Sequence, residues 1–217
     1  MMLFLHCHLS KGVDYDKIYR IHKERRPAVS LFSPHHTFRA YYQLTPAFLR
    51  EQGVRVLLLD IDNTLAPYEQ PLPDERLRRW LSSLREAGIA VAFLSNNHAG
   101  RVELFNRELG LPCRYDAYKP LTRRAKKLYR SLGGTNKTTA FMGDQIFTDV
   151  CCARLAGARA YLVPPIWDKR DVGTRFKRWL EKGILKRFYK KHKDEPDVRE
   201  GNPITEEIRA EMEKRKI

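Results

Sequence analysis

Short apolar runs alternate with amphipathic stretches throughout residues 54–170, and this alternation limits the possible folds more than any other feature of the chain. Val54–Leu59 and Ile89–Leu94 are apolar runs of the length that suits strands buried on both faces. Between them, Asp74–Ala87 carries large apolar residues at helical spacing and stops at Gly88, a natural helix end. Strand, helix and strand in this order predict a parallel sheet covered by helices on both faces.

The same alternation continues to residue 163. The further elements that it predicts are helices near Gly100–Leu109, Leu121–Leu132 and Thr148–Ala156, and strands near Arg114–Ala117, Thr138–Met142 and Ala158–Val163. We therefore expect an α/β fold with a central parallel sheet. In such sheets the active site lies outside the carboxyl ends of the strands.

Polar residues follow four successive predicted strands, at the edge of the sheet where an active site is expected. They are Asp60 and Asp62 after the first strand, Ser95, Asn96 and Asn97 after the second, Lys119 after the third, and Asp144 after the fourth, with Asp149 further on. A single acid after a strand is often a helix cap, and that interpretation stays open for Asp144 taken alone. Capping does not explain polar groups at four strand ends. Because buried acids are costly unless they are paired or bind a metal, the four aspartates predict a cation.

Four sequence motifs carry a family resemblance. They are LDIDNTL (59–65), LSNN (94–97), YKP (118–120) and GDQIFTDV (143–150). In this order they resemble the motifs of the haloacid dehalogenase (HAD) superfamily, and most closely those of its bacterial YqeG family. YqeG-type proteins are similar to the mitochondrial phosphatidylglycerophosphate phosphatases. The resemblance covers roughly Phe32 to Tyr189 and implies a HAD-like Rossmannoid three-layer sandwich, a magnesium-dependent phosphatase and a lipid-phosphate substrate.

The resemblance also implies roles for the reactive groups, and each role makes chemical sense. Asp60 would attack phosphorus and form an aspartyl-phosphate, which splits one difficult step into two. Asp62 would protonate the leaving alkoxide and then deprotonate the water that hydrolyses the intermediate. Ser95 would donate a hydrogen bond to a phosphoryl oxygen, and Lys119 would offset the negative charge that builds there.

The resemblance further implies a magnesium site at the same strand ends. Asp144, Asp60 and a backbone carbonyl near Asp62 would hold Mg²⁺, an ion that prefers oxygen ligands. Asp149 would be a direct ligand or an acid just behind the ligands, and an exposed acid on a first helical turn is the alternative. The residues expected to bind substrate are Thr64, Asn96 and Asn97.

The spacing of the motifs leaves no room for a cap domain. Each interval between them is used up by a single loop, helix and strand. We therefore expect an open site. Open HAD sites resemble those that act on large substrates, where the polymer, protein or membrane itself covers the reaction.

Positive charge indicates an anionic partner. The chain has 41 Lys and Arg against 26 Asp and Glu, a formal net charge of +15, which suits nucleic acid or an anionic membrane. Residues 173–193 carry nine Lys/Arg and one acid, with aromatic and aliphatic residues at helical spacing. That pattern is typical of a helix lying on a membrane surface. Packing of its apolar face on the sheet is the alternative.

These observations predict four regions and a location. The regions are an N-terminal extension of unknown order (1–30), a phosphatase core (31–170), a basic amphipathic segment (171–193) and a charged C-terminal tail (194–217). No segment is long and apolar enough to span a bilayer, and none of the four cysteines forms a C-x-x-C pair. We expect a cytoplasmic protein. If its substrate is a lipid, we expect it to bind peripherally to the inner face of the membrane. The sequence leaves the oligomeric state open.

Three functions are consistent with these features. The first is hydrolysis of phosphatidylglycerophosphate to phosphatidylglycerol at an anionic membrane. The second is a HAD phosphatase acting on a nucleic-acid end or a small soluble phosphate ester, although no RNP, KH or zinc-finger pattern is present. The third is a non-catalytic scaffold that binds RNA or membrane. The four intact motifs count against the scaffold.

Overall fold

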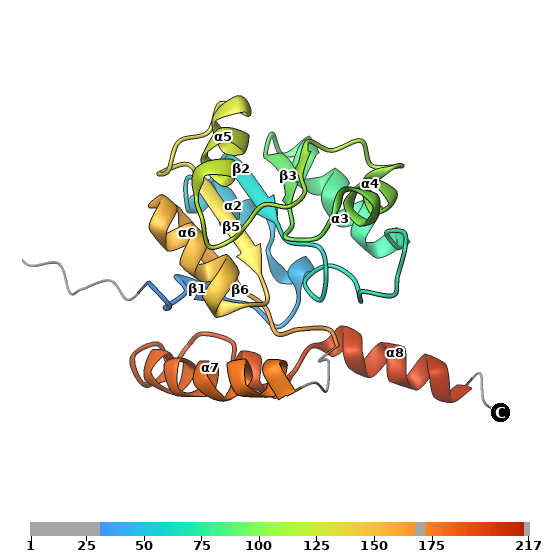
Figure 1. The fold of residues 1–217 in the computed structure, drawn as a ribbon, viewed down its shortest axis with the longest axis vertical. Helices are drawn as coiled ribbons and strands as arrows, with labels where there is room; N and C mark the ends of the chain where they lie inside the picture. The colour runs from blue at the N-terminus through green and yellow to red at the C-terminus, as the bar shows by residue number, and fades with distance from the viewer. Residues whose placement is uncertain (1–30, 168–171, 215–217) are drawn as a thin grey trace, which may run out of the picture. The chain divides into compact units, whose positions relative to one another are not determined.

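One parallel sheet organises the computed structural model, which describes residues 31–167 and 172–214 (Figure 1). The expected N-terminal extension, residues 1–30, lies outside the described residues. The strands are β1 (His36–Thr37), β2 (Val56–Leu59), β3 (Ala90–Leu94), β4 (Cys113–Arg114), β5 (Thr139–Gly143) and β6 (Arg159–Leu162). Their order across the sheet is β1-β6-β5-β2-β3-β4, and every neighbouring pair is parallel. The expected α/β fold with a central parallel sheet is confirmed.

Helices lie between these strands, and two more follow β6. They are α2 (Pro46–Glu51), α3 (Glu75–Glu86), α4 (Ala99–Asn106), α5 (Arg123–Ser131), α6 (Cys151–Ala156), α7 (Val172–Lys191) and α8 (Pro203–Lys214). Short 3-10 turns lie at η1 (Tyr41–Gln43) and η3 (Val198–Glu200), and a π-helical turn, η2 (Ile146–Val150), precedes α6. The helix expected over Thr148–Ala156 is therefore divided, with its first part wound as the π turn.

The order of the strands creates a switch point between β2 and β5. From β2 the chain adds β3 and β4 on one side, and it then returns to add β5 and β6 on the other side. Ligands bind at such a point because the connections after the two neighbouring strands leave in opposite directions. Asp60 directly follows β2, and its backbone N–H donates to Met142 O of β5 at 3.0 Å.

Two apolar cores cover the two faces of the sheet. On one face, Leu57 and Leu59 of β2 share a buried cluster with Leu77 of α3. On the other face, Val56 and Leu58 of the same strand share a cluster with residues of α5 and α6. All four residues of β2 are buried, which confirms the strand expected to be covered on both sides.

Helix α3 shows how local sequence positions these layers. Asp74 caps the helix, since its side chain accepts the N–H of Leu77 at 2.7 Å. The large apolar side chains at helical spacing face the sheet and are buried. Gly88 follows with φ of 76°, a left-handed conformation that favours glycine and turns the chain toward β3.

The outer edge of β1 is closed by a residue from far along the chain. The N–H of Thr37 donates to Oε2 of Glu195 at 2.8 Å, while Oε1 of Glu195 lies 2.7 Å from Nδ1 of His36. Backbone groups on either side of Thr37, at His35 and Phe38, pair with β6 instead. Glu195 thus satisfies an edge amide that would otherwise be open to another strand.

Helix α7 contains most of the segment expected to be basic and amphipathic. Its residues Leu185 and Phe188 are buried, and Leu185 belongs to the core cluster of the second face. The buried carboxylate of Glu181 accepts the N–H of Ile146 at 3.0 Å. Trp179 is 66 % exposed. This part of the helix therefore packs on the core through one face and exposes another.

The stretch after α7, for which the sequence predicts a charged tail, is folded between residues 194 and 214. Asn202 is buried and donates through Nδ2 to Pro164 O at 2.9 Å. Val198 is also buried, in the second apolar cluster. Specific contacts of this kind anchor a stretch whose composition is mostly charged. No helix among the described residues is long and apolar enough to cross a membrane.

Candidate active site

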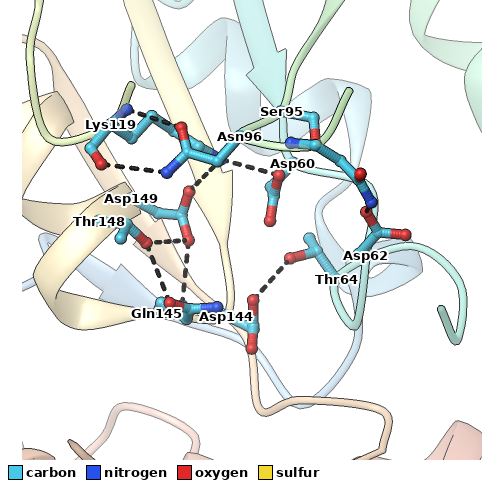
Figure 2. Close-up of polar contacts among 11 residues, drawn as sticks. Asp60, Asp62, Thr64, Ser95, Asn96, Lys119, Asp144, Gln145, Thr148 and Asp149 are labelled. Carbon is cyan, nitrogen blue, oxygen red and sulfur yellow. Dashed lines mark hydrogen bonds and ion pairs between the residues drawn. The ribbon is translucent and has the colours of Figure 1, made fainter. Parts of the chain in front are cut away.

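Three buried carboxylates meet at the switch point of the sheet. Asp60 follows β2, Asp144 follows β5 and Asp149 lies in η2 (Figure 2). Among the described residues, these three offer oxygen atoms that all lie within 4.8 Å of one another. Parallel strands end at the same edge of the sheet, so residues far apart in sequence come together here.

Lys119 lies between two of these carboxylates. Its Nζ is 2.8 Å from Oδ1 of Asp60 and 2.6 Å from Oδ1 of Asp149, and its side chain is almost completely buried (Figure 2). Burial alone would lower the pKa of Lys119, but the charges of Asp149 and Asp60 outweigh burial and raise the pKa. The ammonium group is therefore positively charged at neutral pH.

Burial and the neighbouring charges act together on Asp60. Its pKa is raised to about 8: burial is the largest cause, the charges of Asp149 and Asp144 add to the increase, and Lys119 opposes it. A cation bound at this cluster would therefore favour its ionised form. Three carboxylates in mutual reach are the hard oxygen ligands that suit a divalent ion, so the residues present fit such a metal.

Gly143 and η2 determine where Asp149 lies. A β-carbon on Gly143 would come within 2.2 Å of Cγ of Asp149, so only glycine leaves room for this carboxylate. Its Oδ2 accepts the N–H of Gln145 at 3.1 Å and the hydroxyl of Thr148 at 3.3 Å. Since Lys119 occupies Oδ1, groups of the protein fix both oxygens of Asp149.

Asp62 stands apart from the three carboxylates and has partners of its own. Its Oδ1 accepts from Nε of Arg101 at 3.0 Å, and its Oδ2 accepts from Nδ2 of Asn97 at 2.9 Å. Nη2 of Arg101 also lies 2.9 Å from Oδ1 of Asp62. The carboxylate is therefore held by two side chains that come from the segment after β3.

Sequence reasoning missed Arg101. The arginine lies in the first turn of α4, four residues after the LSNN motif, and its guanidinium group packs 5.1 Å from the ring centre of Phe105. The available signal was a basic residue in the first turn of the helix that follows the LSNN motif. A cation is unfavourable near a helix N-terminus, so an arginine there indicates a specific acidic partner.

The remaining predicted residues interlock around the carboxylates. Ser95 is buried, and its Oγ accepts the N–H of Asn97 at 3.1 Å. Asn96 exchanges two hydrogen bonds with the backbone of Lys119, at 3.0 and 2.7 Å, and so ties the segment after β3 to the segment after β4. The hydroxyl of Thr64 donates to Oδ1 of Asp144 at 3.3 Å.

The structure therefore brings all nine sequence-predicted site residues to one edge of the sheet. Three of them, expected to bind substrate, make contacts within the protein: Thr64 with Asp144, Asn96 with Lys119 and Asn97 with Asp62. The described connections after β2 and β3 lead directly into α3 and α4, with no domain inserted between them.

Comparison with known proteins gives one family and several relatives. A family model described as "Mitochondrial PGP phosphatase" matches residues 26–165. The chain is 33 % identical over 160 residues to "Probable phosphatase YqeG" of Bacillus subtilis, a match that covers 74 % of this chain and 93 % of that protein.

Solved structures give weaker matches. An uncharacterized protein from Listeria monocytogenes serotype 4b is 17 % identical with a TM-score of 0.42, and the match covers 60 % of this chain and 100 % of that one. A cobalt-bound deoxy-D-mannose-octulosonate 8-phosphate phosphatase from Haemophilus influenzae is 16 % identical with a TM-score of 0.41. That match covers 63 % of this chain and 90 % of the other.

Proposed function

Because the chain belongs to the mitochondrial PGP phosphatase family and is a HAD-type phosphatase similar to YqeG, we propose that it hydrolyses phosphatidylglycerophosphate to phosphatidylglycerol and phosphate. The observation that carries the chemistry is the meeting of Asp60, Asp144 and Asp149, with Lys119 between Asp60 and Asp149. The family description supports the lipid substrate.

Asp60 is the nucleophile in this proposal. Its carboxylate oxygen forms a bond to phosphorus while the bond from phosphorus to the glycerol oxygen breaks, which leaves an aspartyl-phosphate. Lys119, 2.8 Å from Asp60, is placed to offset the charge of the phosphoryl oxygens. The buried hydroxyl of Ser95 is free to donate to one of these oxygens, since its oxygen only accepts in the contact with Asn97.

Asp62 is the general acid and then the general base. In its protonated form it gives a proton to the leaving glycerol oxygen, and it later takes a proton from the water that attacks phosphorus. The attack of that water breaks the bond to Asp60 and releases phosphate. Arg101 and Asn97 hold the carboxylate of Asp62 in one orientation for both steps.

The proposed metal is Mg²⁺, which Asp60 and Asp144, together with the backbone near Asp62, would hold. When bound, it would neutralise part of the negative charge on the phosphoryl group. Asp149 is the third acid of the cluster, and Lys119 lies between it and Asp60. Because its two oxygens already accept from Lys119, Gln145 and Thr148, we assign Asp149 the task of orienting Lys119.

The lipid substrate fits a site without a cap. Nothing is inserted in the described connections after β2 and β3, so a bilayer surface is able to approach the strand ends. The net charge of +15 suits an anionic bilayer. In this proposal the enzyme lies peripherally on a membrane. A small soluble phosphate ester brings no such surface to the strand ends.

Phosphate release across a panel of substrates tests the proposal. The panel contains phosphatidylglycerophosphate in detergent micelles, sugar phosphates, nucleotides and a DNA oligonucleotide with a terminal phosphate, each with and without Mg²⁺. We expect the lipid to have the highest kcat/KM and the Asp60→Asn variant to release no phosphate from it. A higher kcat/KM for the oligonucleotide or a soluble ester would overturn the assignment of a lipid substrate.

A further inference from the structure

A four-residue turn places the buried Lys119 between two exposed apolar side chains. The N–H of Leu121 donates to Tyr118 O at 2.8 Å and closes the turn. Lys119 points inward and is 7 % exposed, whereas Tyr118 is 58 % and Leu121 67 % exposed. The residue that reaches the reacting groups and those that face solvent are thus only one or two positions apart in the chain.

Tyr118 has a backbone conformation that is costly for an aromatic residue. Its φ is 55°, in the left-handed region that glycine and asparagine adopt at far lower cost than an aromatic residue. Its ring lies 4.5 Å from the guanidinium carbon of Arg124, which itself donates to the backbone of Tyr115 and Asp116. The exposed ring is therefore held in place and buries little area of its own.

Positive charge follows this turn along the chain. Residues 122–137 contain six Lys/Arg and no acid, and Asp116, before the turn, lies 2.9 Å from the ring of His98. Helix α5 begins two residues after the turn, and its exposed basic residues are Arg123, Lys127 and Arg130. Exposed apolar groups with cations behind them are what a protein presents to an anionic bilayer, where side chains insert and cations meet headgroups.

We propose that Tyr118 and Leu121, with Arg123, Lys127 and Arg130 behind them, form the surface that docks this enzyme on anionic lipid. We call these five residues the docking rim. The inference rests on the proposed function, since docking here would bring a lipid headgroup to Lys119. A second copy of the chain is a poorer occupant, because two proteins of net charge +15 repel each other.

Vesicle sedimentation tests the apolar part of the docking rim. The probes are vesicles of phosphatidylcholine alone and of phosphatidylcholine mixed with phosphatidylglycerol. We expect the double variant Tyr118→Ser, Leu121→Ser to bind the mixed vesicles at least about tenfold more weakly. Each serine has much less apolar surface to bury in the bilayer than the side chain that it replaces. Leu155→Ser, on α6 and 46 % exposed, is the matched control and should bind like the parent.

The charged part has its own test and control. Changing Arg123, Lys127 and Arg130 to Gln should weaken binding by about fivefold per charge, and added salt should reduce the difference. The control changes Lys182, Lys186 and Lys190 of α7 to Gln. A larger loss in this α7 variant than in the α5 variant would overturn the docking rim.

Fluorescence quenching locates the contact directly. A tryptophan introduced as Leu121→Trp should be quenched by brominated lipid in mixed vesicles, and one introduced as Leu155→Trp should not. The three native tryptophans give the same background fluorescence in both variants. Equal quenching of the two variants would contradict the proposal. This measurement holds even where the serine variants fold poorly.

Activity separates this inference from the proposed function. Hydrolysis of water-soluble p-nitrophenyl phosphate should be the same in the parent and in the docking-rim variants, while hydrolysis of lipid in vesicles should fall. If the parent binds through the rim but hydrolyses no phosphatidylglycerophosphate, the proposed substrate is wrong and the rim stands. If it hydrolyses that lipid in micelles while the rim variants bind vesicles like the parent, the rim is wrong. Loss of a dimer in the variants, with unchanged vesicle binding, would also overturn the rim.

Discussion

The guanidinium group of Arg101 donates through Nε and Nη2 to a single oxygen, Oδ1, of Asp62, at 3.0 and 2.9 Å. Both side chains are largely shielded from water, with 12 and 17 % exposed. An ion pair that is shielded and held at two donors is costly to break from one side. The carboxylate of Asp62 is therefore kept in one orientation by a residue from α4.

Replacing this arginine should slow the chemistry with little effect on substrate binding. We expect Arg101→Gln to lower kcat about 10- to 100-fold, because a misplaced acid–base group loses the aligned geometry that proton transfer needs. Arg101→Lys should recover part of the loss. Steady-state kinetics gives kcat and KM separately, and Arg107→Gln, exposed just beyond the end of the same helix, is the control. An effect on KM alone would contradict a positioning role.

Asp60→Asn should fold normally and lose almost all turnover, since an amide is a poor nucleophile toward phosphorus. Because the variant also removes one of three clustered carboxylates, it should bind Mg²⁺ more weakly in calorimetry. Circular dichroism before and after the change checks the fold. Phosphatase activity near that of the parent would show that Asp60 is not the nucleophile.

Asp62→Asn should act selectively on poor leaving groups. Release of an alkoxide needs a proton, so we expect this step to slow about 10²- to 10⁴-fold. Release of an activated aryl oxygen needs none and should slow less in the first step. Single-turnover experiments on an alkyl and an aryl phosphate compare the two, and equal losses would count against a general acid.

Gly143→Ala should displace Asp149. The added β-carbon would lie 2.2 Å from Cγ of Asp149, so the carboxylate has to move away from Lys119. We expect a loss of about 1–3 kcal/mol in the free energy of unfolding and at least about a hundredfold in kcat. Gly183→Ala is the matched control: nothing lies within 4 Å of its added carbon in α7, so urea unfolding should show unchanged or slightly higher stability.

His35 should make the fold sensitive to mild acid. Burial, with the charges of Arg154 and Arg159, lowers its pKa from 6.5 to about 4. As the pH falls, His35 therefore takes up a proton in the unfolded chain before it does so in the folded protein. The contribution of neutral His35 to stability is present above pH 6.5 and is lost progressively as the pH falls toward 4. Urea unfolding should lose less stability between pH 7 and 5 in His35→Gln than in the parent; equal losses would contradict this.

The parts of the fold that sequence predicts are those in which local pattern and buried position agree. The strand β2 is a continuous apolar run and β5 is buried along its whole length, and the acids that follow them stand where parallel strands end. Asp60 and Asp144 are therefore found from periodicity alone. Their roles come from the likeness of the motifs, which pattern by itself does not supply.

The parts that sequence does not predict depend on contacts between distant residues. Arg101 has a long side chain that reaches acids in several directions, so its place in the chain does not identify Asp62 as its partner. The stretch after α7 looks like a solvated tail because its composition is mostly charged, yet Asn202 and Glu195 each satisfy one specific buried or edge group. Single contacts of this kind leave no periodic signal.

The contact between Glu195 and the outer edge of β1 has a consequence for synthesis of the chain. His36 pairs with Tyr161, and Thr37 donates to Glu195, so β1, the first of the described strands to leave the ribosome, has neither of these partners until most of the chain has followed it. Contacts this distant in sequence form late and slowly. On the nascent chain the sheet must therefore grow outward from β2 and β3, and β1 joins it last.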